Sequence, residues 1–240
     1  MIQTYLFDLY GTLVDIHTDE SMPSLWTRMA MFLSMKGAAY GPKELRSAYE
    51  DLVAKEKRRQ AEKLPLPSRH FAEPEIRHVF RALFALRGIE ADANEVEDAA
   101  VVFRSLSLRR IGLYPGAKET LQTLRQRGKG VYLLSNAQAA FTMPELHMLG
   151  LAPLFDGVVL SSDAGIQKPD RAIFEHILSK YGLRPEACLM IGNDAEADIL
   201  GAAGAGIGAR YIHTKQSPPR LGALPEGCRE IGDLRELLRA

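Results

Sequence analysis

The sequence predicts an α/β protein with a doubly wound, mostly parallel sheet as its core and a smaller, all-helical second unit. Three observations support this fold class. An apolar run near the N-terminus ends at Asp8, residues 17–111 have the spacing of amphipathic helices, and short β-rich runs alternate with helical patterns from Leu113 onward. Such alternation is typical of βαβ units, which place parallel strands side by side.

The elements of the core follow in chain order. Strands are predicted at residues 4–8, 130–135, 157–161, 187–192 and 209–213. Between the later strands, the apolar spacing predicts helices over residues 117–128, 170–182 and 195–204. A glycine stands at or just past the end of each of these helices, where helices commonly stop.

The helical segment of residues 17–111 is predicted to be an insertion. It is interrupted at Gly37–Pro42, Leu64–Ser68 and Gly88–Asp92. Because Asp8 precedes it and the other strands follow it, the insertion must leave the sheet near the strand end that carries Asp8. We therefore expect a core of residues 1–16 and 112–240, covered at that end by a helical cap of residues 17–111.

The composition favours a small-molecule enzyme. The 240 residues carry 30 basic and 30 acidic side chains, so the zero net charge provides no attraction to nucleic acid or to an anionic membrane. No apolar stretch approaches the roughly 18–20 residues that span a bilayer. The two cysteines, Cys188 and Cys228, lie in different sequence settings and do not have the spacing of metal ligands. Because this usage fits a reducing compartment, we expect a cytoplasmic protein. The sequence does not indicate an oligomeric state.

Asp8 is the first candidate for chemistry. It stands where an apolar strand stops and a Gly-Thr turn follows, which directs a carboxylate toward solvent. With a reference pKa of about 3.9, the carboxylate is ionised at neutral pH and needs no base to act as a nucleophile. A phosphate dianion about 4 Å away would be repelled by roughly 2 kcal/mol in water, so cations must offset this repulsion. Taken alone, Asp8 would be interpreted as a residue that caps a turn.

Three later segments supply matching groups. Lys168 precedes a Pro-Asp helix start and can reach a bound anion, and Ser135 with Asn136 follows a strand end, where their side chains and nearby N–H groups can hold phosphate oxygens. Asp194 and Asp198, spaced i and i+4 after an apolar strand, suit Mg²⁺. The alternative for this acidic pair is a solvated first helical turn favoured by the helix dipole. Sites at the carboxyl ends of strands are expected in open α/β sheets.

Together these segments resemble the four motifs of the haloacid dehalogenase superfamily: Asp8 with Thr12, then Ser135, then Lys168, then Asp194 with Asp198. Residues 114–121 also resemble the helix start that follows the cap in that family. The resemblance implies a Rossmann-like core and a nucleophilic Asp8. It further implies substrate contacts from Thr12, Ser135, Asn136 and Lys168, and a metal bound by Asp8, the Tyr10 carbonyl and an acidic residue of the fourth motif.

Two departures from the family pattern bear on the reaction. Tyr10 replaces the second Asp that protonates the leaving group in the phosphatases of the family, and Asn193 stands where many relatives have an acidic residue. Such a general acid contributes typically about 10²- to 10⁴-fold, so substrates that leave as stable anions are favoured. We expect a Mg²⁺-dependent phosphatase that acts on a small phosphorylated molecule through an aspartyl-phosphate on Asp8.

Two alternatives stay open. The segment around Asp8 and Tyr10 also resembles the first motif of L-2-haloacid dehalogenases, which need no metal and form an ester on the aspartate. Against this, the chain lacks the Ser/Asn-rich fourth motif of those enzymes, and their arginine and aromatic segment is not clearly matched, although Trp26 and Arg28 lie in the right region. The other alternative is a catalytically weakened protein that binds a phosphorylated ligand.

Overall fold

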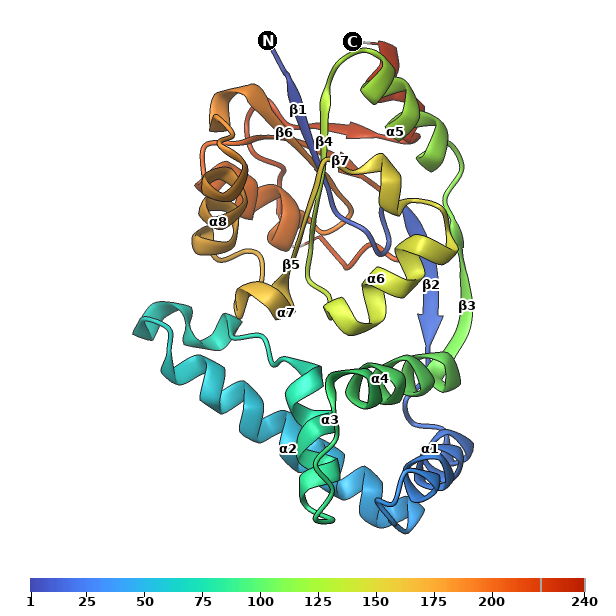
Figure 1. Ribbon diagram of the computed structural model, residues 1–240. Helices are drawn as coiled ribbons and strands as arrows, with labels where there is room; N and C mark the ends of the chain where they lie inside the picture. The colour runs from blue at the N-terminus through green and yellow to red at the C-terminus, as the bar shows by residue number, and fades with distance from the viewer. Residues whose placement is uncertain (221, 240) are drawn as a thin grey trace.

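The core of the protein is a six-stranded parallel sheet in the order β5-β4-β1-β6-β7-β8 (Figure 1). The computed structural model describes residues 1–220 and 222–239. The strands are β1 (Thr4–Phe7), β4 (Gly130–Ser135), β5 (Gly157–Leu160), β6 (Cys188–Gly192), β7 (Gly208–Ile212) and β8 (Arg229–Ile231). The predicted α/β fold class is confirmed, and the first five of these strands lie within one residue of their predicted positions at each end.

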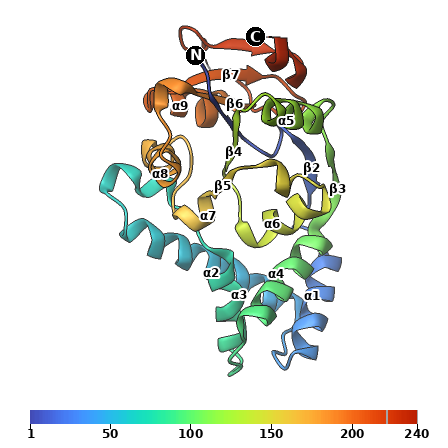
Figure 2. The same ribbon diagram turned by 45° about the horizontal axis from the view of Figure 1, so that its top comes forward.

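Helices cover both faces of the sheet because alternate strand residues point to opposite sides. Tyr5 and Phe7 of β1 pack in one apolar cluster with α5 and α6, whereas Leu6 packs in another with α8 and α9. Figure 2 shows the two helix layers on either side of the strands. These helices are α5 (Ala117–Gln126), α6 (Ala139–Met148), α8 (Arg171–Tyr181) and α9 (Gly201–Gly204).

Four short helices lie in the connections of the core, and a fifth follows the last strand. They are η2 (Ala152–Leu154), α7 (Ser161–Ala164), η3 (Pro185–Ala187), the π-helical turn η4 (Ala195–Leu200) and η5 (Leu234–Arg239). The predicted helix over residues 195–204 is therefore divided into η4 and α9. The sequence did not predict α6, because Pro144 lies inside it and its apolar residues show almost no single face.

Helices α1–α4 form a separate cluster beyond one end of the sheet, away from both chain termini (Figure 1). They pack around Trp26, Tyr49, Phe80 and Phe103, whose rings make stacked, tilted and edge contacts at centroid distances of 4.8–5.9 Å. The elements are α1 (Pro23–Met35), α2 (Pro42–Glu62), η1 (Leu66–Phe71), α3 (Ile76–Ala85) and α4 (Ala93–Ser107). The breaks after α1, α2 and α3 overlap the predicted interruptions, whereas the break at residues 72–75 between η1 and α3 was not predicted.

A two-stranded antiparallel ribbon joins this helical cluster to the core. It consists of β2 (Val14–Thr18) and β3 (Leu108–Leu113), which pair with a register irregularity at His17/Thr18. The sequence analysis did not predict the ribbon. The predicted boundaries between core and cap, at residues 16/17 and 111/112, fall inside these two strands, and the division into domains stays a prediction.

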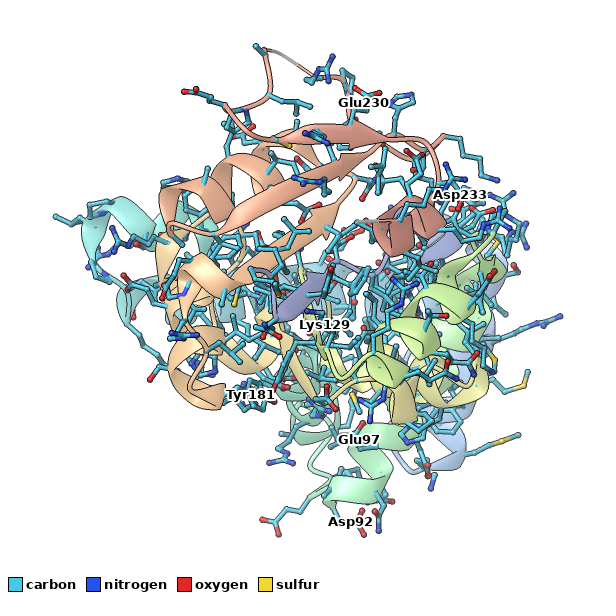
Figure 3. The ribbon with its side chains drawn as sticks, turned by 90° about the horizontal axis from the view of Figure 1, so that it is seen from above. Asp92, Glu97, Lys129, Tyr181, Glu230 and Asp233 are labelled. Carbon is cyan, nitrogen blue, oxygen red and sulfur yellow. The ribbon has the colours of Figure 1, made fainter. Side chains whose placement is uncertain are left out.

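A polar contact lies at the opposite end of the sheet. Lys129, labelled near the centre of Figure 3, donates from Nζ to the carbonyl oxygen of Ile2 at 2.7 Å, just before β1 begins.

Among the helices in the part of the chain that the structure describes, none has the length and apolar character needed to cross a bilayer.

One buried carboxylate in the cap yields a pH-dependent prediction. Glu56 is 7% exposed and accepts hydrogen bonds from Arg59, Gln60 and His78 at 2.6–2.9 Å. Burial alone would raise its pKa, but these hydrogen bonds lower the pKa of Glu56 to about 2. Because this value lies below the unfolded-state value, the stability that Glu56 contributes is present above pH about 4.5 and is lost as the pH falls toward 2.

We expect Glu56→Gln to lower the free energy of unfolding at pH 7. At pH 3, the difference in this free energy between the variant and the wild type should be smaller by about 2 kcal/mol. Urea unfolding at the two pH values measures this. Glu50→Gln, at an exposed position of the same helix that pairs with Arg46, is the matched control and should show almost no pH-dependent gap. An equal gap at both pH values would contradict the prediction.

Candidate active site

Asp8 lies directly beyond the carboxyl end of β1, the third strand of the sheet from the β5 edge. It is 6% exposed, and each of its carboxylate oxygens accepts a hydroxyl hydrogen bond at 3.1 Å. Ser135 Oγ, at the end of β4, donates to Oδ1, and Thr12 Oγ1, in the turn after Asp8, donates to Oδ2. The carboxylate is thus held in one orientation by two neutral donors.

Lys168 places a buried ammonium between two carboxylates. Its Nζ lies 2.8 Å from Asp8 Oδ1, 2.6 Å from Asp198 Oδ1 and 2.8 Å from the Leu134 carbonyl oxygen, which uses all three ammonium donors. Burial alone would lower its pKa, but Asp198 and Asp8 raise the pKa of Lys168, so the ammonium stays charged. Burial raises the pKa of Asp198, which the lysine opposes.

Asn136 fixes the loop that carries this lysine. Its side-chain Nδ2 donates to the Lys168 carbonyl oxygen at 2.9 Å, and its Oδ1 accepts from the Lys168 backbone N–H at 2.8 Å. This paired contact joins the loop after β4 to the loop before α8. The carboxamide of Asn136 is therefore largely occupied by the protein itself.

The two acidic residues of the segment after β6 have different surroundings. Asp194 caps η4, because its Oδ1 accepts from the backbone N–H groups of Glu196 and Ala197 at 2.9 Å. Asp198 is fully buried against Lys168 and accepts the Asp194 N–H at 3.0 Å. A Cβ on Gly192 would lie 2.1 Å from the Asp198 carboxylate, so this approach requires glycine.

Asn193 faces the nucleophile from the same segment. Its Oδ1 lies 3.1 Å from Thr12 Oγ1, the hydroxyl that also donates to Asp8. Gly11 makes this approach possible: it has a φ of +84°, and a Cβ there would lie 2.4–2.9 Å from atoms of the Asn193 side chain. The Gly-Thr turn after Asp8 therefore packs directly on the segment after β6.

We expect Gly11→Ala to lower the free energy of unfolding by about 1–3 kcal/mol, because it adds a left-handed backbone penalty to the collision with Asn193. Gly88→Ala is the matched control, since Gly88 has a φ of +73° but no atom within 4 Å of its added Cβ. Chemical unfolding of both variants separates the two effects. Equal losses of stability in Gly11→Ala and Gly88→Ala would mean that the Asn193 side chain moves aside at no cost in free energy.

Tyr10 does not direct its hydroxyl at Asp8. The hydroxyl donates to Glu145 Oε2 at 2.5 Å and lies 2.9 Å from Thr142 Oγ1, both on α6. Glu145 Oε1 in turn accepts from Arg104 Nε of α4 at 2.6 Å. Burial and Glu145 raise the pKa of Tyr10, which Arg104 opposes, so the phenol stays protonated. The network links the Asp8 loop to a helix of the cap.

These groups line a cavity of about 180 Å³. The loop after β7, which the sequence analysis did not single out, also contributes Gln216 and Pro218 to this cavity. That loop is held by Thr214 Oγ1, which donates to the Gly11 carbonyl oxygen at 2.7 Å, and by Gln216, which donates to the Ile16 carbonyl oxygen. No residue of the 17–111 segment, all of which the structure describes, lines it. The lining residues are Asp8, Tyr10, Ser135, Asn136, Lys168, Asn193, Asp194, Ala197, Asp198, Gln216 and Pro218.

The predicted site residues thus meet at one edge of the sheet. Asp8, Thr12, Ser135, Lys168 and Asp198 are joined by direct hydrogen bonds. Thr12, predicted to contact the substrate, is fully buried and does not line the cavity, whereas Asn136 and Asp194 line it but bond chiefly to backbone groups. A family model of haloacid dehalogenase-like hydrolases matches residues 2–206. The chain belongs to this family.

Relatives of this haloacid dehalogenase-like hydrolase include phosphatases. It is 35% identical over 171 residues to the phosphoserine phosphatase of Thermus thermophilus, an alignment that covers 71% of the chain and 66% of the relative. It is 31% identical over 115 residues to the glyceraldehyde 3-phosphate phosphatase of Methanothermobacter thermautotrophicus, which covers 48% of the chain and 51% of that relative. In both cases the alignment covers less than two thirds of the relative's own length.

Solved structures share the fold over the whole chain. The 2-haloacid dehalogenase of Pseudomonas syringae pv. Tomato DC3000 superposes with a TM-score of 0.67, covering 100% of the chain and 97% of that structure at 21% sequence identity. At this identity the likeness shows the fold of the haloacid dehalogenase-like hydrolase and does not distinguish between phosphate and halide chemistry.

Proposed function

We propose that the protein is a Mg²⁺-dependent phosphatase that forms an aspartyl-phosphate on Asp8. The observation that carries the proposal is the buried Asp8–Lys168–Asp198 group with Ser135 and Thr12 around the Asp8 carboxylate. We further propose that the substrate is a small phosphorylated molecule and that the enzyme works in the cytoplasm, where its two free cysteines would stay reduced.

In the proposed reaction, an Asp8 oxygen attacks phosphorus and the bond from phosphorus to the leaving-group oxygen breaks. The leaving group departs with the electron pair. Water then attacks the phosphorus of the acyl phosphate, so that the P–O bond to Asp8 breaks and inorganic phosphate is released. Ser135 and the neighbouring backbone N–H groups hold phosphoryl oxygens during both steps. The Lys168 ammonium, whose three donors are bonded within the site, offsets the repulsion between Asp8 and the phosphoryl group through its charge.

The donor set around Asp8 is compatible with Mg²⁺. Two carboxylates and one ammonium leave the buried Asp8–Lys168–Asp198 group with a formal charge of −1, which would repel a phosphate dianion. Asp8, Asn193 and Asp194 line the cavity with carboxylate and amide oxygens, and hard oxygens of this kind suit Mg²⁺, which usually keeps several waters. Bound there, the ion would offset the charge that Asp8 and the phosphoryl group bring together.

We propose that Asp8, the Tyr10 carbonyl oxygen and an oxygen of residues 193–198 would hold the ion. Of the two acidic residues in that segment, Asp194 has one carboxylate oxygen that accepts no hydrogen bond among the described residues, whereas both oxygens of Asp198 are occupied. The described residues hold no cluster of three or more Asp, Glu, His or Cys side chains suited to a metal. The protein would therefore supply few ligands.

Tyr10 narrows the proposed substrate class. Its hydroxyl is committed to Glu145, and its pKa is raised, so it is a poor proton donor to a leaving group. We therefore propose that acyl phosphates and aryl phosphates, whose leaving groups depart as stable anions, are hydrolysed far better than alkyl phosphates.

Phosphate release from acetyl phosphate and p-nitrophenyl phosphate tests the proposal, with glycerol phosphate as the alkyl comparison. We expect turnover of the first two substrates with Mg²⁺ and its loss on addition of EDTA, with recovery when Mg²⁺ is returned in excess. No phosphate release from any of the three substrates would refute the function.

An L-2-haloacid dehalogenase is the second candidate. Two observations favour it: no carboxylate stands at the Tyr10 position, and the residue facing Thr12 from the fourth motif is the neutral Asn193. Halide departs without a proton, so neither feature would be a handicap. Chloride release from L-2-chloropropionate in EDTA, without phosphatase activity, would establish this candidate in place of the first.

A further inference from the structure

Glu73 is a buried carboxylate that reaches from the helical cluster into the core. It lies between η1 and α3, is 6% exposed, and its two oxygens accept hydrogen bonds from the side-chain amides of Gln138 and Gln167. Gln138 is the residue before α6, and Gln167 directly precedes Lys168. A single side chain of the cap thus joins two loops of the active site.

Backbone hydrogen bonds also join residues 71–73 of the cap to residues 165–167 of the core. Ala72 pairs with Ile166 in an isolated antiparallel bridge, the Gln167 N–H donates to the Phe71 carbonyl oxygen at 2.9 Å, and the Glu73 N–H donates to the Gly165 carbonyl oxygen at 3.1 Å. Gln138 also holds the cap segment, because its Oε1 accepts from the Ile76 N–H at 3.0 Å and its Nε2 donates to the Pro74 carbonyl oxygen at 2.7 Å. Residues 71–76 therefore form a docked segment that joins the cap to the core on the side away from the β2–β3 ribbon.

A charge in this position is costly. Among the residues that the structure describes, Glu73 makes no ion pair, and its hydrogen-bond donors are neutral amides. Burial of a carboxylate without a cation commonly costs several kcal/mol, and a well-packed neutral residue would stabilise the interface better. Burial raises the pKa of Glu73 above its ordinary value, and the neutral side chains of Gln167, Gln138 and Ser161 only partly oppose this rise. Stability alone therefore gives no reason for a carboxylate here.

The partners of Glu73 point to its role. Gln138 is two residues beyond Asn136 and Gln167 is one residue before Lys168, and Asn136 and Lys168 are themselves joined by two hydrogen bonds. Glu73 bridges the same two loops from the cap side. Charge-assisted hydrogen bonds are roughly twice as strong as neutral ones and fix their partners more firmly.

We propose that Glu73 is a positioning residue, which holds the loops of Asn136 and Lys168 in register so that the Lys168 ammonium is directed at Asp8 only while residues 71–76 are docked. The proposal rests on the proposed phosphatase function, since the Lys168 ammonium matters there for the approach of phosphate. It makes docking of the cap a condition for a complete active site, although no cap residue lines the catalytic cavity.

Glu73→Gln tests the role with little change in volume, because one of its two acceptor oxygens becomes an NH₂ group that faces an amide donor. Glu56→Gln is the matched control: Glu56 is similarly buried, and its hydrogen-bond partners among the described residues all belong to the cap. We expect Glu73→Gln to lower kcat for acetyl phosphate and to weaken binding of inorganic phosphate, each by about 10-fold. Glu56→Gln should lower the thermal midpoint and leave both values unchanged.

The reciprocal variant, which combines Glu73→Gln with Gln167→Glu, provides a rescue. The carboxamide introduced at position 73 can accept from Gln138 through its oxygen and donate through its NH₂ group to the carboxylate introduced at position 167. We therefore expect most of the lost phosphate affinity to return. Wild-type phosphate affinity in Glu73→Gln would overturn the proposal, as would a folded reciprocal variant that binds no better than the single one.

Amide hydrogen exchange gives a readout that needs no turnover. The N–H groups of Gln167 and Lys168 are bonded to Phe71 and Asn136, and we expect Glu73→Gln to speed their exchange by about 10-fold while Glu56→Gln does not. If the wild type hydrolyses no phosphate ester, the proposed function fails but this measurement still tests Glu73. Unchanged exchange at both amides would refute the positioning role itself.

Discussion

Asp8→Asn should abolish turnover, with a loss of about 10⁴-fold or more in kcat, because an amide oxygen cannot serve as the anionic nucleophile. The substitution keeps the shape of the side chain, and its oxygen can still accept from Thr12 or Ser135. It also removes one of the two carboxylates that share Lys168, so the formal charge of the buried group changes from −1 to zero. We therefore expect the thermal midpoint to stay the same or to rise.

Phosphate release from acetyl phosphate and a thermal unfolding scan measure the two effects of Asp8→Asn together. Asp51→Asn, at an exposed position of α2, is the control and should match the wild type in both. A variant at Asp8 that kept more than about one hundredth of the wild-type rate would argue that another group is the nucleophile.

Lys168→Met should give the largest loss of stability, about 3–5 kcal/mol, because it leaves Asp8 and Asp198 buried without a cation. The lysine is 3% exposed, and its three donors all go to atoms of the site. Activity should fall as well, since the charge that opposes the repulsion between Asp8 and phosphate is lost. Lys118→Met, on the exposed side of α5, is the control and should cost little.

A double-mutant cycle can assign the stability loss to the charges. Urea unfolding of Lys168→Met, Asp198→Asn and the double variant should show that the double variant is more stable than the sum of the single losses predicts. Additive losses would indicate that Lys168 acts through packing, and would contradict the electrostatic account of the site.

The sequence was sufficient for the parallel sheet and for the residues at its strand ends. A strand displays its last residue at a fixed edge, so local patterns around Asp8 and Ser135 already place them at one end of the sheet. Lys168 was predicted from its position before a Pro-Asp helix start, and it lies in the loop between α7 and α8. The spacing of Asp194 and Asp198 predicted two carboxylates on one side of a regular helix start. The structure instead has a π-helical turn there, in which Asp194 caps the turn and Asp198 binds Lys168.

The groups that hold the site together could not be predicted in this way. Tyr10 meets Glu145 across 135 positions, and Glu73 meets Gln138 and Gln167 across 65 and 94. Tyr10 meets its partner where α6 packs on the loop after β1, and Glu73 meets its partners where the cap docks on the core. No local sequence pattern carries either kind of information. The β2–β3 ribbon escaped prediction for a related reason, because neither strand is recognisable until its partner lies beside it.

The paired strands β2 and β3 keep the two points where the cap leaves and re-enters the core next to each other. The chain between them therefore behaves as one very long hairpin loop whose ends are already closed, and the entropy of closing a loop rises only slowly with its length. The six parallel strands do not depend on how many residues that loop contains. In such an architecture the helical segment between β2 and β3 can be replaced during evolution while the reacting groups of the core stay in place.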